Sequence, residues 1–433
     1  MIPAARISAA IEVIGDIETN RRPAVEALKA WGLAHRFAGS GDRAAIAGLA
    51  YDTLRRKSST GFLMGSDTPR AAVLGMLKLE RGFGVDALAS LFSGERFAPE
   101  PLTVDEKRAL TSATLDDAPA HVAGDYPEWL DPHLARTFGD ARVEEAAALA
   151  RRAPLDLRVN TLKGKRDQAL AQLSHVGVVA CAWSPIGLRI APKPDAKSPA
   201  IQAEPAFIKG LVEVQDEGSQ LVALMAGAQP GELVIDLCAG AGGKTLALAA
   251  AMENRGQIFA TDRDKRRLAP IHDRLKRAGV RSVDVRTPAG EADPVADLAG
   301  KADLVLIDAP CTGTGTWRRN PDAKWRTRPG ALEQRCKEQA EVLDRAASLV
   351  KSGGRIAYVT CSVLTEENDD QAQAFVTRHP QFEVAAAVPN AWMSDNILQR
   401  LRQAALPTRA GLLMTPHRTG TDGFYLALFR RHI

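Results

Sequence analysis

Apolar residues recur at helical spacing through the first part of the chain. Ile7, Ile11 and Ile14 lie three and four positions apart, and Val73, Met76 and Leu77 repeat the pattern further on. No segment within roughly the first 115 residues alternates apolar and polar side chains with the period of two that a half-buried strand shows. The pattern predicts an all-helical domain over residues 1–120, which ends at a proline-marked stretch.

From about residue 206 the pattern changes to short apolar runs that alternate with helical stretches. The runs are ELVIDL, QIFATD, SVDVRT, ADLVLIDAP and GRIAYVTCS, and segments such as KTLALAAAM separate them. Continuous apolar strands with helical crossovers are typical of a parallel sheet with helices on both faces. We therefore expect a doubly wound, mostly parallel α/β domain over residues 206–433, with FYLALF as an added edge strand.

The residues between these two regions combine both kinds of pattern. A helix is expected over about 140–151, and DLRVNTL is strand-like. Residues 121–205 are therefore predicted to form a linker and a small α+β subdomain between the helical domain and the α/β domain.

The composition is that of an ordinary globular protein. Hydrophobic residues are 45% and charged residues 25% of the 433 residues, which argues against general disorder. No stretch approaches the roughly 18 apolar residues of a membrane span, and the first residues lack the layout of a signal peptide. Five cysteines without a CxxC pair and eight histidines without metal-ligand spacing favour neither disulfides nor zinc. We expect a cytoplasmic monomer with no metal and no membrane partner.

The distribution of charge says more than the net charge of +4. Residues 255–281 are basic but helical in pattern, which is typical of a solvated helix face. Residues 317–335 contain six basic side chains against two acids, with Trp317 and Trp325 among them, and their pattern is loop-like. Basic residues interleaved with aromatic ones are the composition of a nucleic-acid surface.

A glycine-rich loop, DLCAGAGGKT at 236–245, follows the first apolar run. Glycines let the backbone approach a ligand at a helix N-terminus. A P-loop would fit Gly243-Lys244-Thr245, but its first glycine would fall on Cys238, and a dinucleotide fingerprint would need a glycine at Thr245. The remaining interpretation is a loop that cradles S-adenosylmethionine, and the alternative is a tight turn with an N-capping aspartate.

The second apolar run ends in Asp262, 20 residues after Gly242. An acid at this place accepts hydrogen bonds from both hydroxyls of a ribose. Together, the loop and the acid predict S-adenosylmethionine as the cofactor.

Two cysteines follow neighbouring apolar runs: Cys311 in DAPC and Cys361 in TCS. Because strand carboxyl ends form the ligand crevice of an open α/β sheet, both thiols should lie at the same edge as the glycine-rich loop. A buried structural cysteine is the alternative for either one alone.

A thiol beside a methyl donor fits methylation of a pyrimidine at carbon 5. A thiolate that adds to carbon 6 makes carbon 5 nucleophilic, and a local lowering of the thiol's pKa would favour the thiolate. A carboxyl group such as Asp308, facing ring nitrogen 3, would help by protonation or hydrogen bonding. A second thiol would assist product release, and spacing alone leaves open which cysteine has which role.

Three motifs, DLCAGAGGKT, DAPCTGTGTWRRNPDAKW and TCSVLTEEN, occur in the same order as in the Sun/RsmB family of RNA cytosine-5 methyltransferases, which the chain resembles. RVNTLK at 158–163, VQDEGSQ at 214–220 and DGFYLALFRR near the end agree with this resemblance, which covers most of 126–433. The N-terminal helices, with DRAAIAGLAYDTLRR, are similar to the NusB-like RNA-binding domain of some bacterial members. The resemblance implies a Rossmann-like methyltransferase fold.

The resemblance also implies roles for the matching residues. Cys361 would be the nucleophile and Cys311 would serve product release, although Cys311 stays a rival nucleophile because DNA cytosine methyltransferases place theirs in a Pro-Cys motif. The residues expected around the cofactor are Cys238, Ala239, Gly240, Ala241, Gly242, Gly243, Lys244, Asp262 and Asp308. Family members usually carry an aspartate near the adenine where this chain has Ala289, with Glu291 or Asp293 as substitutes.

RNA is the expected partner, with ribosomal RNA preferred by resemblance to members with a NusB-like domain and transfer RNA second. The target base must be unpaired or flipped out of its stack. Arg158, Arg318, Lys324 and Trp325 are predicted to contact RNA. Arg158 has the alternative of a strand-edge surface pair with Asn160, and Trp325 that of a loop anchor.

Two functions from other classes compete with this interpretation. An RNA-binding assembly factor without turnover would use the same fold, and the departure at Ala289 favours it slightly, whereas the two cysteines argue against it. An ATPase built on Gly243-Lys244-Thr245 would need the glycine that Cys238 replaces.

Overall fold

The computed structural model describes residues 1–192, 199–290 and 292–433. The chain folds into two compact units. The first contains residues 1–152 together with 317–327, and the second contains most of the remaining residues. The helices between residues 120 and 152 thus pack with the N-terminal unit, whereas the sequence placed a boundary near 120.

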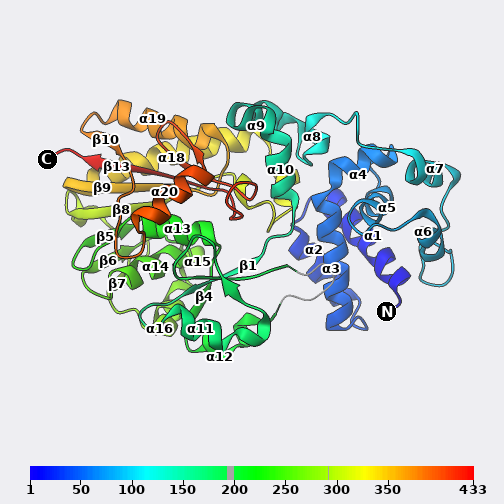
Figure 1. Cartoon of the computed structure of the whole chain (residues 1–433), viewed down its shortest axis with the longest axis horizontal. Helices are drawn as coiled ribbons and strands as arrows, with labels where there is room; N and C mark the ends of the chain where they lie inside the picture. Colours follow the sequence, from blue (N-terminus) through cyan, green and yellow to red (C-terminus); the bar gives the residue numbers. More distant parts are fainter. Residues whose placement is uncertain (193–198, 291) are drawn as a thin grey trace. The chain divides into compact units, whose positions relative to one another are not determined.

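The N-terminal unit is helical, as predicted. Its helices are α1 (Pro3–Asn20), α2 (Ala24–Ala34), α3 (Ser40–Arg55), α4 (Lys57–Met64), α5 (Pro69–Leu79), α6 (Val85–Leu91), α7 (Val104–Ser112), α8 (Ala120–Ala123), α9 (Asp131–Phe138), α10 (Arg142–Ala150) and α17 (Ala323–Arg326) (Figure 1). The periodic residues of the sequence pattern form its core, where Ile7, Ile14, Val73 and Met76 are buried. Burial of one apolar stripe per helix explains the helical spacing.

Residues 317–327 are a segment of the basic loop that packs inside the N-terminal unit. Lys324 is buried, and its ammonium donates to the carbonyl oxygens of Arg55 at 3.0 Å and Asp125 at 2.5 Å. The indole N–H of Trp325 donates to the carbonyl oxygen of Leu54 at 2.7 Å. Trp325 is therefore a loop anchor, and the prediction that Lys324 contacts RNA is wrong for this conformation because its side chain is enclosed.

Arg318 is buried in the same segment, with its carbonyl oxygen 2.7 Å from the Nη1 donor of Arg55. A buried guanidinium cannot reach a phosphate on the surface. The prediction that Arg318 contacts RNA is therefore corrected as well.

A small antiparallel sheet opens the second unit. Its strands are β1 (Leu155–Val159), β2 (Val179–Ala180), β3 (Gly187–Ile190) and β4 (Val212–Val214), accompanied by α11 (Arg166–Gln172) and α12 (Pro205–Ile208). The strand order is β2-β3-β1-β4. Because β1 lies between two strands, Arg158 is neither at a strand edge nor on the surface but buried, with Nε 2.6 Å from Gln215 Oε1. Both interpretations of Arg158 are therefore corrected.

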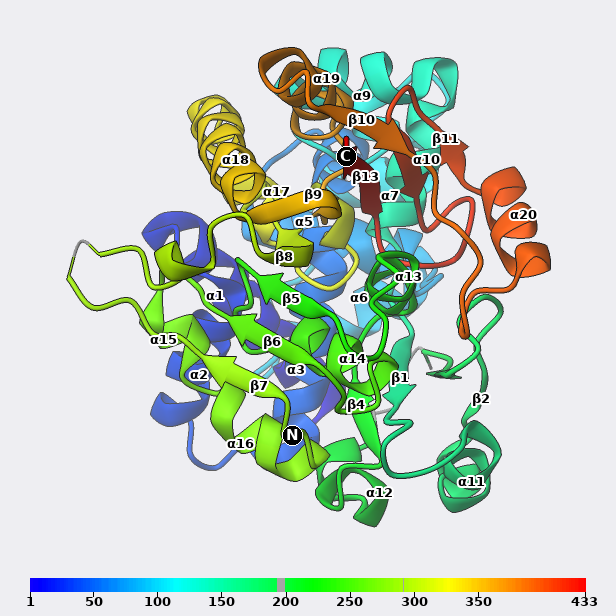
Figure 2. The same cartoon turned by 90° about the vertical axis from the view of Figure 1, so that its left-hand side faces the viewer.

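Among the described residues, nine strands form one mixed sheet with the order β11-β12-β13-β9-β8-β5-β6-β7 and with β10 on β13. The strands are β5 (Leu233–Asp236), β6 (Gln257–Ala260), β7 (Val283–Val285), β8 (Ala302–Asp308), β9 (Val350–Thr360), β10 (Phe382–Ala385), β11 (Leu406–Pro407), β12 (Gly411–Met414) and β13 (Phe424–Arg431). Five neighbouring strands of this sheet, in the order β9-β8-β5-β6-β7, are parallel and correspond to the five predicted apolar runs (Figure 2).

Strand β13 is interior, and the prediction of an edge strand is wrong. It pairs antiparallel with β9 on one side. On its other side β12 covers its first half and β10 its second half. Its continuous apolar run FYLALF is explained by this enclosure, since an interior strand buried on both faces has no polar alternation.

Helices cover both faces of the large sheet (Figure 2). They are α13 (Glu217–Met225), α14 (Gly243–Ala251), α15 (Lys265–Leu268), α16 (Ile271–Ala278), α18 (Pro329–Leu349), α19 (Asp369–Arg378) and α20 (Asp395–Ala404). Helices α13 and α14 pack in one core with Leu304 of β8. On the other face, the ring of Phe375 in α19 lies 4.8 Å from that of Phe429 in β13.

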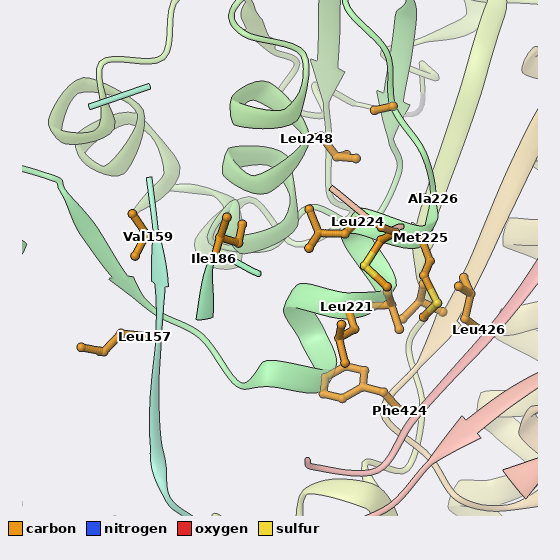
Figure 3. Packing of buried hydrophobic residues seen from close by; sticks show 14 of the residues in the cluster. Leu157, Val159, Ile186, Leu221, Leu224, Met225, Ala226, Leu248, Phe424 and Leu426 are labelled. Carbon is orange, nitrogen blue, oxygen red and sulfur yellow. The ribbon is translucent and has the colours of Figure 1, made fainter. Parts of the chain in front are cut away.

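Helix α13 joins the two sheets of the second unit. Leu221 and Met225 of α13 share one hydrophobic core with Leu157 of the small sheet and Leu426 of the large sheet (Figure 3). The described residues of 121–205 are thus divided, since 121–152 belong to the N-terminal unit and β1 and β3 share the core of the predicted α/β domain. Within the described ranges, no helix is both long and apolar enough to cross a membrane.

The buried ammonium of Lys324 predicts a pH-dependent stability. Burial lowers the pKa of Lys324 to about 7, whereas an unfolded lysine has a pKa of about 10.4. Between these values the unfolded state binds more protons, so the free energy of unfolding rises with pH, by up to about 1.4 kcal/mol per pH unit. Lys324→Met removes this rise.

The measurement is urea denaturation of wild type and Lys324→Met at several pH values between about 7 and 10. Lys107→Met, at an exposed lysine of α7, is the matched control and keeps the wild-type slope. Parallel pH dependence of wild type and Lys324→Met would contradict the prediction.

Candidate active site

A pocket lies at the carboxyl ends of the parallel strands, where the strand order reverses between β5 and β8. This switch point is the usual ligand crevice of an open α/β sheet. Its lining comes from the segments after β5, β6 and β8 and from α18, and comprises Leu237, Cys238, Asp262, Arg263, Arg267, Asp308, Pro310, Glu338, Glu341, Val342 and Arg345. The structure thus brings the predicted residues Cys238, Asp262 and Asp308 together.

The glycine-rich loop closes tightly over the end of β5. Gly242 has a left-handed backbone with φ of 82°, and a Cβ at this position would lie 2.5 Å from Ile271 of α16. Helix α14 begins at the next residue, Gly243. Only glycine meets both demands at 242, which explains this position of the motif.

Asp262 holds the glycine-rich loop from the end of β6. Its carboxylate accepts the backbone N–H of Gly240 at 2.9 Å and that of Asp264 at 2.9 Å. The carboxylate is almost fully buried and still lines the pocket. A carboxylate has about four acceptor positions, so these two bonds leave capacity for ribose hydroxyls.

A second support of the loop comes from the small sheet, and sequence reasoning missed it. Arg274 of α16 donates to the carbonyl oxygen of Ala241 at 2.8 Å and forms an ion pair with Glu213 of β4 at 3.1 Å. Gln215 follows β4 and accepts from the buried Arg158. Glu213 directly precedes the motif VQDEGSQ, and the two motifs RVNTLK and VQDEGSQ contain the bonded pair Arg158 and Gln215, so their occurrence in the resemblance was the signal for this region.

Below the loop lies the fully buried Asp236 at the end of β5. The hydroxyl of Thr245 donates to it at 2.7 Å, and burial raises the pKa of Asp236 to about 7. The bond ties the first turn of α14 to the strand and fixes the direction in which the helix leaves the sheet.

Lys244 and Asp308 form an ion pair at 2.7 Å across the loops after β5 and β8. The ammonium is nearly buried and lies 5.1 Å from the centre of the Phe424 ring, whereas the carboxylate is 36% exposed. The pair presents a hydrogen-bond acceptor at the pocket. Against the ATPase alternative, the lysine that would bind phosphates is paired with Asp308.

The two cysteines of the strand ends meet. The Sγ atoms of Cys311 and Cys361 are 3.3 Å apart, and both cysteines are free thiols. The hydrogen bond to Cys361, together with burial, raises the pKa of Cys311 well above its usual range. Either sulfur can act as the donor of this hydrogen bond.

Buried polar side chains hold the loops that carry these thiols. The carboxylate of Glu367 accepts the backbone N–H and the hydroxyl of Thr312, at 2.8 and 2.5 Å, and the amide of Gln339 at 3.1 Å. Thr314 and Ser362 share a hydrogen bond of 3.0 Å between their hydroxyls. Thr312, Thr314, Ser362 and Glu367 lie in the motifs that begin with DAPC and TCS. Gln339 of α18 lies outside these motifs, and nothing in the sequence predicted its contact with Glu367.

Comparison with known proteins agrees with this architecture. Residues 223–430 match the family described as 16S rRNA methyltransferase RsmB/F, and residues 126–196 match its ferredoxin-like domain. A relative from Synechocystis, named probable ribosomal RNA small subunit methyltransferase B, is 35% identical over 314 residues, which are 71% of this chain and 67% of the relative.

The chain belongs to the RsmB/F family of methyltransferases. Its matches span about two thirds of the length of the curated relatives. The crystal structure of the protein PH0851 has a TM-score of 0.72 at 26% identity and covers 100% of this chain and 99% of that one. NSun6 from Pyrococcus horikoshii, solved with SFG, shows the same fold, with a TM-score of 0.59 at 21% identity over 70% of this chain and 98% of its own.

The cofactor of this RsmB/F-family methyltransferase is S-adenosylmethionine. The pocket fits it, because the acid Asp262 and the glycine-rich loop meet in one crevice with Asp308. Of the substitutes considered for Ala289, Glu291 lies outside the described residues. Asp293 binds Arg345 of α18, with Arg345 Nε 3.0 Å from Asp293 Oδ2, so its carboxylate is occupied by a pocket arginine.

One group of side chains in the described part of the chain has metal-ligand geometry: Asp156, Cys181 and Glu217, all buried. The guanidinium of Arg189 lies among them, 2.7 Å from Asp156 and 3.3 Å from Glu217. This cation balances the carboxylates, and the cluster joins the small sheet to α13.

A close backbone contact near the thiols predicts an effect of Gly315→Ala. The N–H of Gly315 donates to the carbonyl oxygen of Cys361 at 2.9 Å, and a Cβ on Gly315 would lie 2.3 Å from the carbonyl oxygen of Gly423. Gly315→Ala must push these backbones apart, so we expect a loss of about 1–3 kcal/mol in the free energy of unfolding.

Chemical denaturation checks this, and calorimetric titration with S-adenosylhomocysteine, the demethylated cofactor, should show unchanged affinity because the cofactor pocket is not touched. Gly330→Ala on α18 is the control, since nothing lies within 4 Å of a Cβ there. Equal stability of both variants would refute the close contact.

Proposed function

We propose that this chain transfers a methyl group from S-adenosylmethionine to carbon 5 of a cytosine in RNA through a covalent bond between Cys361 and the base. The observation that carries the proposal is the contact of two free thiols at 3.3 Å. They stand beside the pocket, since Pro310, the neighbour of Cys311 in the chain, lines it.

The roles of the two thiols are those that the resemblance implies, with the nucleophile in TCS at Cys361 and the product-release thiol in DAPC at Cys311. The raised pKa of Cys311, caused by the neighbouring thiol and by burial, supports Cys311 as the thiol that keeps its proton while Cys361 attacks. Addition of the Cys361 thiolate to carbon 6 breaks the carbon 5–carbon 6 double bond and makes carbon 5 nucleophilic. The bound cofactor supplies an electrophilic methyl group on its sulfonium.

The ion pair of Lys244 and Asp308 serves the opposite edge of the base. The carboxylate of Asp308, 2.7 Å from the ammonium of Lys244, accepts a hydrogen bond from the amino group on carbon 4. As negative charge develops on the ring after thiolate addition, the pair stabilises it electrostatically.

Product release needs the reverse bond changes. The proton on carbon 5 passes to water, the carbon 5–carbon 6 double bond re-forms, and the bond between carbon 6 and Cys361 breaks. The protonated thiol of Cys311 lies at hydrogen-bond distance from the departing sulfur and stabilises it as a thiolate. Loss of Cys311 therefore leaves the covalent adduct in place.

Ribosomal RNA is the proposed substrate. The relatives that match this chain are named ribosomal RNA small subunit methyltransferases. The all-helical N-terminal unit agrees with the NusB-like domain expected from the sequence.

The test is transfer of labelled methyl from S-adenosylmethionine to RNA from a strain that lacks this protein, separated into ribosomal and transfer RNA. We expect label in ribosomal RNA as 5-methylcytosine and a loss of at least about 1,000-fold in Cys361→Ala, because the nucleophile is gone. Cys311→Ala should accumulate a protein–RNA adduct that survives denaturing electrophoresis and disappears with ribonuclease.

Cys336→Ala is the matched control, since Cys336 is a half-buried thiol on α18 outside the contact of the pair. An adduct in Cys361→Ala instead of Cys311→Ala would reverse the two roles. Label found only in transfer RNA would make transfer RNA the substrate instead of ribosomal RNA. Cofactor binding without methyl transfer to any RNA would favour an RNA-binding assembly factor without turnover.

A further inference from the structure

The contact between the two thiols of the site also permits a reaction other than methyl transfer. Cys311 and Cys361 are both free and half-buried, and their sulfur atoms lie 3.3 Å apart. A disulfide bond measures about 2.05 Å, so the two sulfurs need to approach each other by only about 1.3 Å to form one. Within the described ranges, no other two cysteine sulfurs are in contact.

The backbone around the pair suits a disulfide as well. Neighbouring strands lie about 4.8 Å apart, and disulfides join Cα atoms that are about 4.4–6.8 Å apart. The N–H of Ala309 donates to the carbonyl oxygen of Val359 at 2.8 Å, and that of Gly315 donates to Cys361 at 2.9 Å, so the two segments stay together. Cys311 and Cys361 lie just beyond the ends of β8 and β9, where a small shift breaks no bond of the sheet.

The two thiols differ in the way that a stepwise oxidation requires. Peroxides oxidise a thiolate and not a protonated thiol. Cys361 attacks as a thiolate in the proposed reaction, and because a nucleobase must reach its sulfur, a much smaller peroxide can reach it too. The neighbouring thiol and burial raise the pKa of Cys311 well above its usual range, so Cys311 remains a thiol while Cys361 reacts.

The other three cysteines lack this combination. Burial raises the pKa of Cys336 to about 11, and it also raises the pKa of Cys181 and of Cys238. These thiols therefore stay protonated and are slow to oxidise. They provide an internal reference for any oxidation of the pair.

We propose that Cys311 and Cys361 form a site of reversible oxidative modification, at which hydrogen peroxide converts the two thiols into a disulfide and stops methyl transfer. The modification itself depends only on the two sulfurs. Its effect on activity rests on the proposed function, because the sulfur that attacks the base is the one that becomes bonded.

The reaction balances with one molecule of hydrogen peroxide. The thiolate of Cys361 attacks one oxygen, the oxygen–oxygen bond breaks, and the hydroxide that leaves takes up a proton to become water. Cys361 is then a sulfenic acid. The sulfur of Cys311 attacks the sulfur of Cys361, and the proton of Cys311 leaves with the hydroxyl group as a second water. The two sulfurs together lose two electrons, which the peroxide gains.

The second thiol makes the modification reversible. A dithiol such as dithiothreitol restores both thiols by thiol–disulfide exchange. A sulfenic acid without a neighbouring thiol is instead open to further oxidation to sulfinic acid, which dithiols do not reduce. Cys311 thus protects the nucleophile Cys361 from permanent loss.

The test treats the full chain with hydrogen peroxide in the absence of RNA, removes the peroxide with catalase and blocks the remaining thiols with iodoacetamide. In wild type we expect the free thiols to fall from five per chain to three. Mass spectrometry of an unreduced digest should find the peptide of Cys311 joined to that of Cys361. Methyl transfer should fall at least about tenfold and return after dithiothreitol, because the nucleophile is blocked and then released.

Two variants and an unfolded control separate a built site from general thiol oxidation. Cys311→Ser should give sulfinic acid at Cys361 that persists after dithiothreitol. Cys336→Ser, at a thiol outside the pair, is the matched control and should form the wild-type cross-link. Calorimetric titration with S-adenosylhomocysteine reports that both variants are folded. In urea the contact is lost, so several different cysteine pairings are expected.

Two results for the folded wild type would overturn the proposal: five remaining thiols, or sulfinic acid at Cys361 without a cross-link. The same mixture of pairings with and without urea would do so too. Methyl transfer by the reduced protein alongside any of these results leaves the proposed function standing. A Cys311–Cys361 cross-link in a protein that transfers no methyl group even when reduced would refute the function and leave the modification site. A cross-linked protein with undiminished transfer would refute Cys361 as the nucleophile and, with it, the effect on activity.

Discussion

The parallel pairing of β8 with β9 is the constraint on which the site depends. Asp308 lies opposite Val359 in this register, and the N–H of Ala309 continues the ladder at 2.8 Å. Both strands therefore end at the same level, and two cysteines that are 50 residues apart in the chain meet at 3.3 Å. A slip of one residue would move a strand by about 3.3 Å and turn its side chains to the other face, which would separate the thiols.

Polar contacts fix the loops beyond these strands. Glu367 is buried, and burial raises its pKa. Such a group is tolerated because three donors from Thr312 and Gln339 satisfy it. A buried and satisfied network has few alternative arrangements, so the thiols are held in position before a substrate arrives.

The small sheet has a comparable role for the cofactor loop. It shares one core with the large sheet through α13, and its strand β4 holds Arg274 beneath Ala241. Arg158 lies buried in the same small sheet, where it binds Gln215 directly after β4. A residue that the sequence analysis assigned to a phosphate is therefore enclosed inside the protein and bound to a neighbouring side chain.

The sequence by itself determined the elements and the chemistry of the crevice. The five parallel strands, the glycine-rich loop with Asp262 and the two strand-end cysteines could all be predicted, because strand periodicity and motif spacing are local properties. Only the tertiary structure decided what is enclosed. The sequence pattern indicated surface positions for Lys324 and Arg158 and an edge position for β13, because burial depends on segments that lie far away in the sequence, such as Arg55 for Lys324.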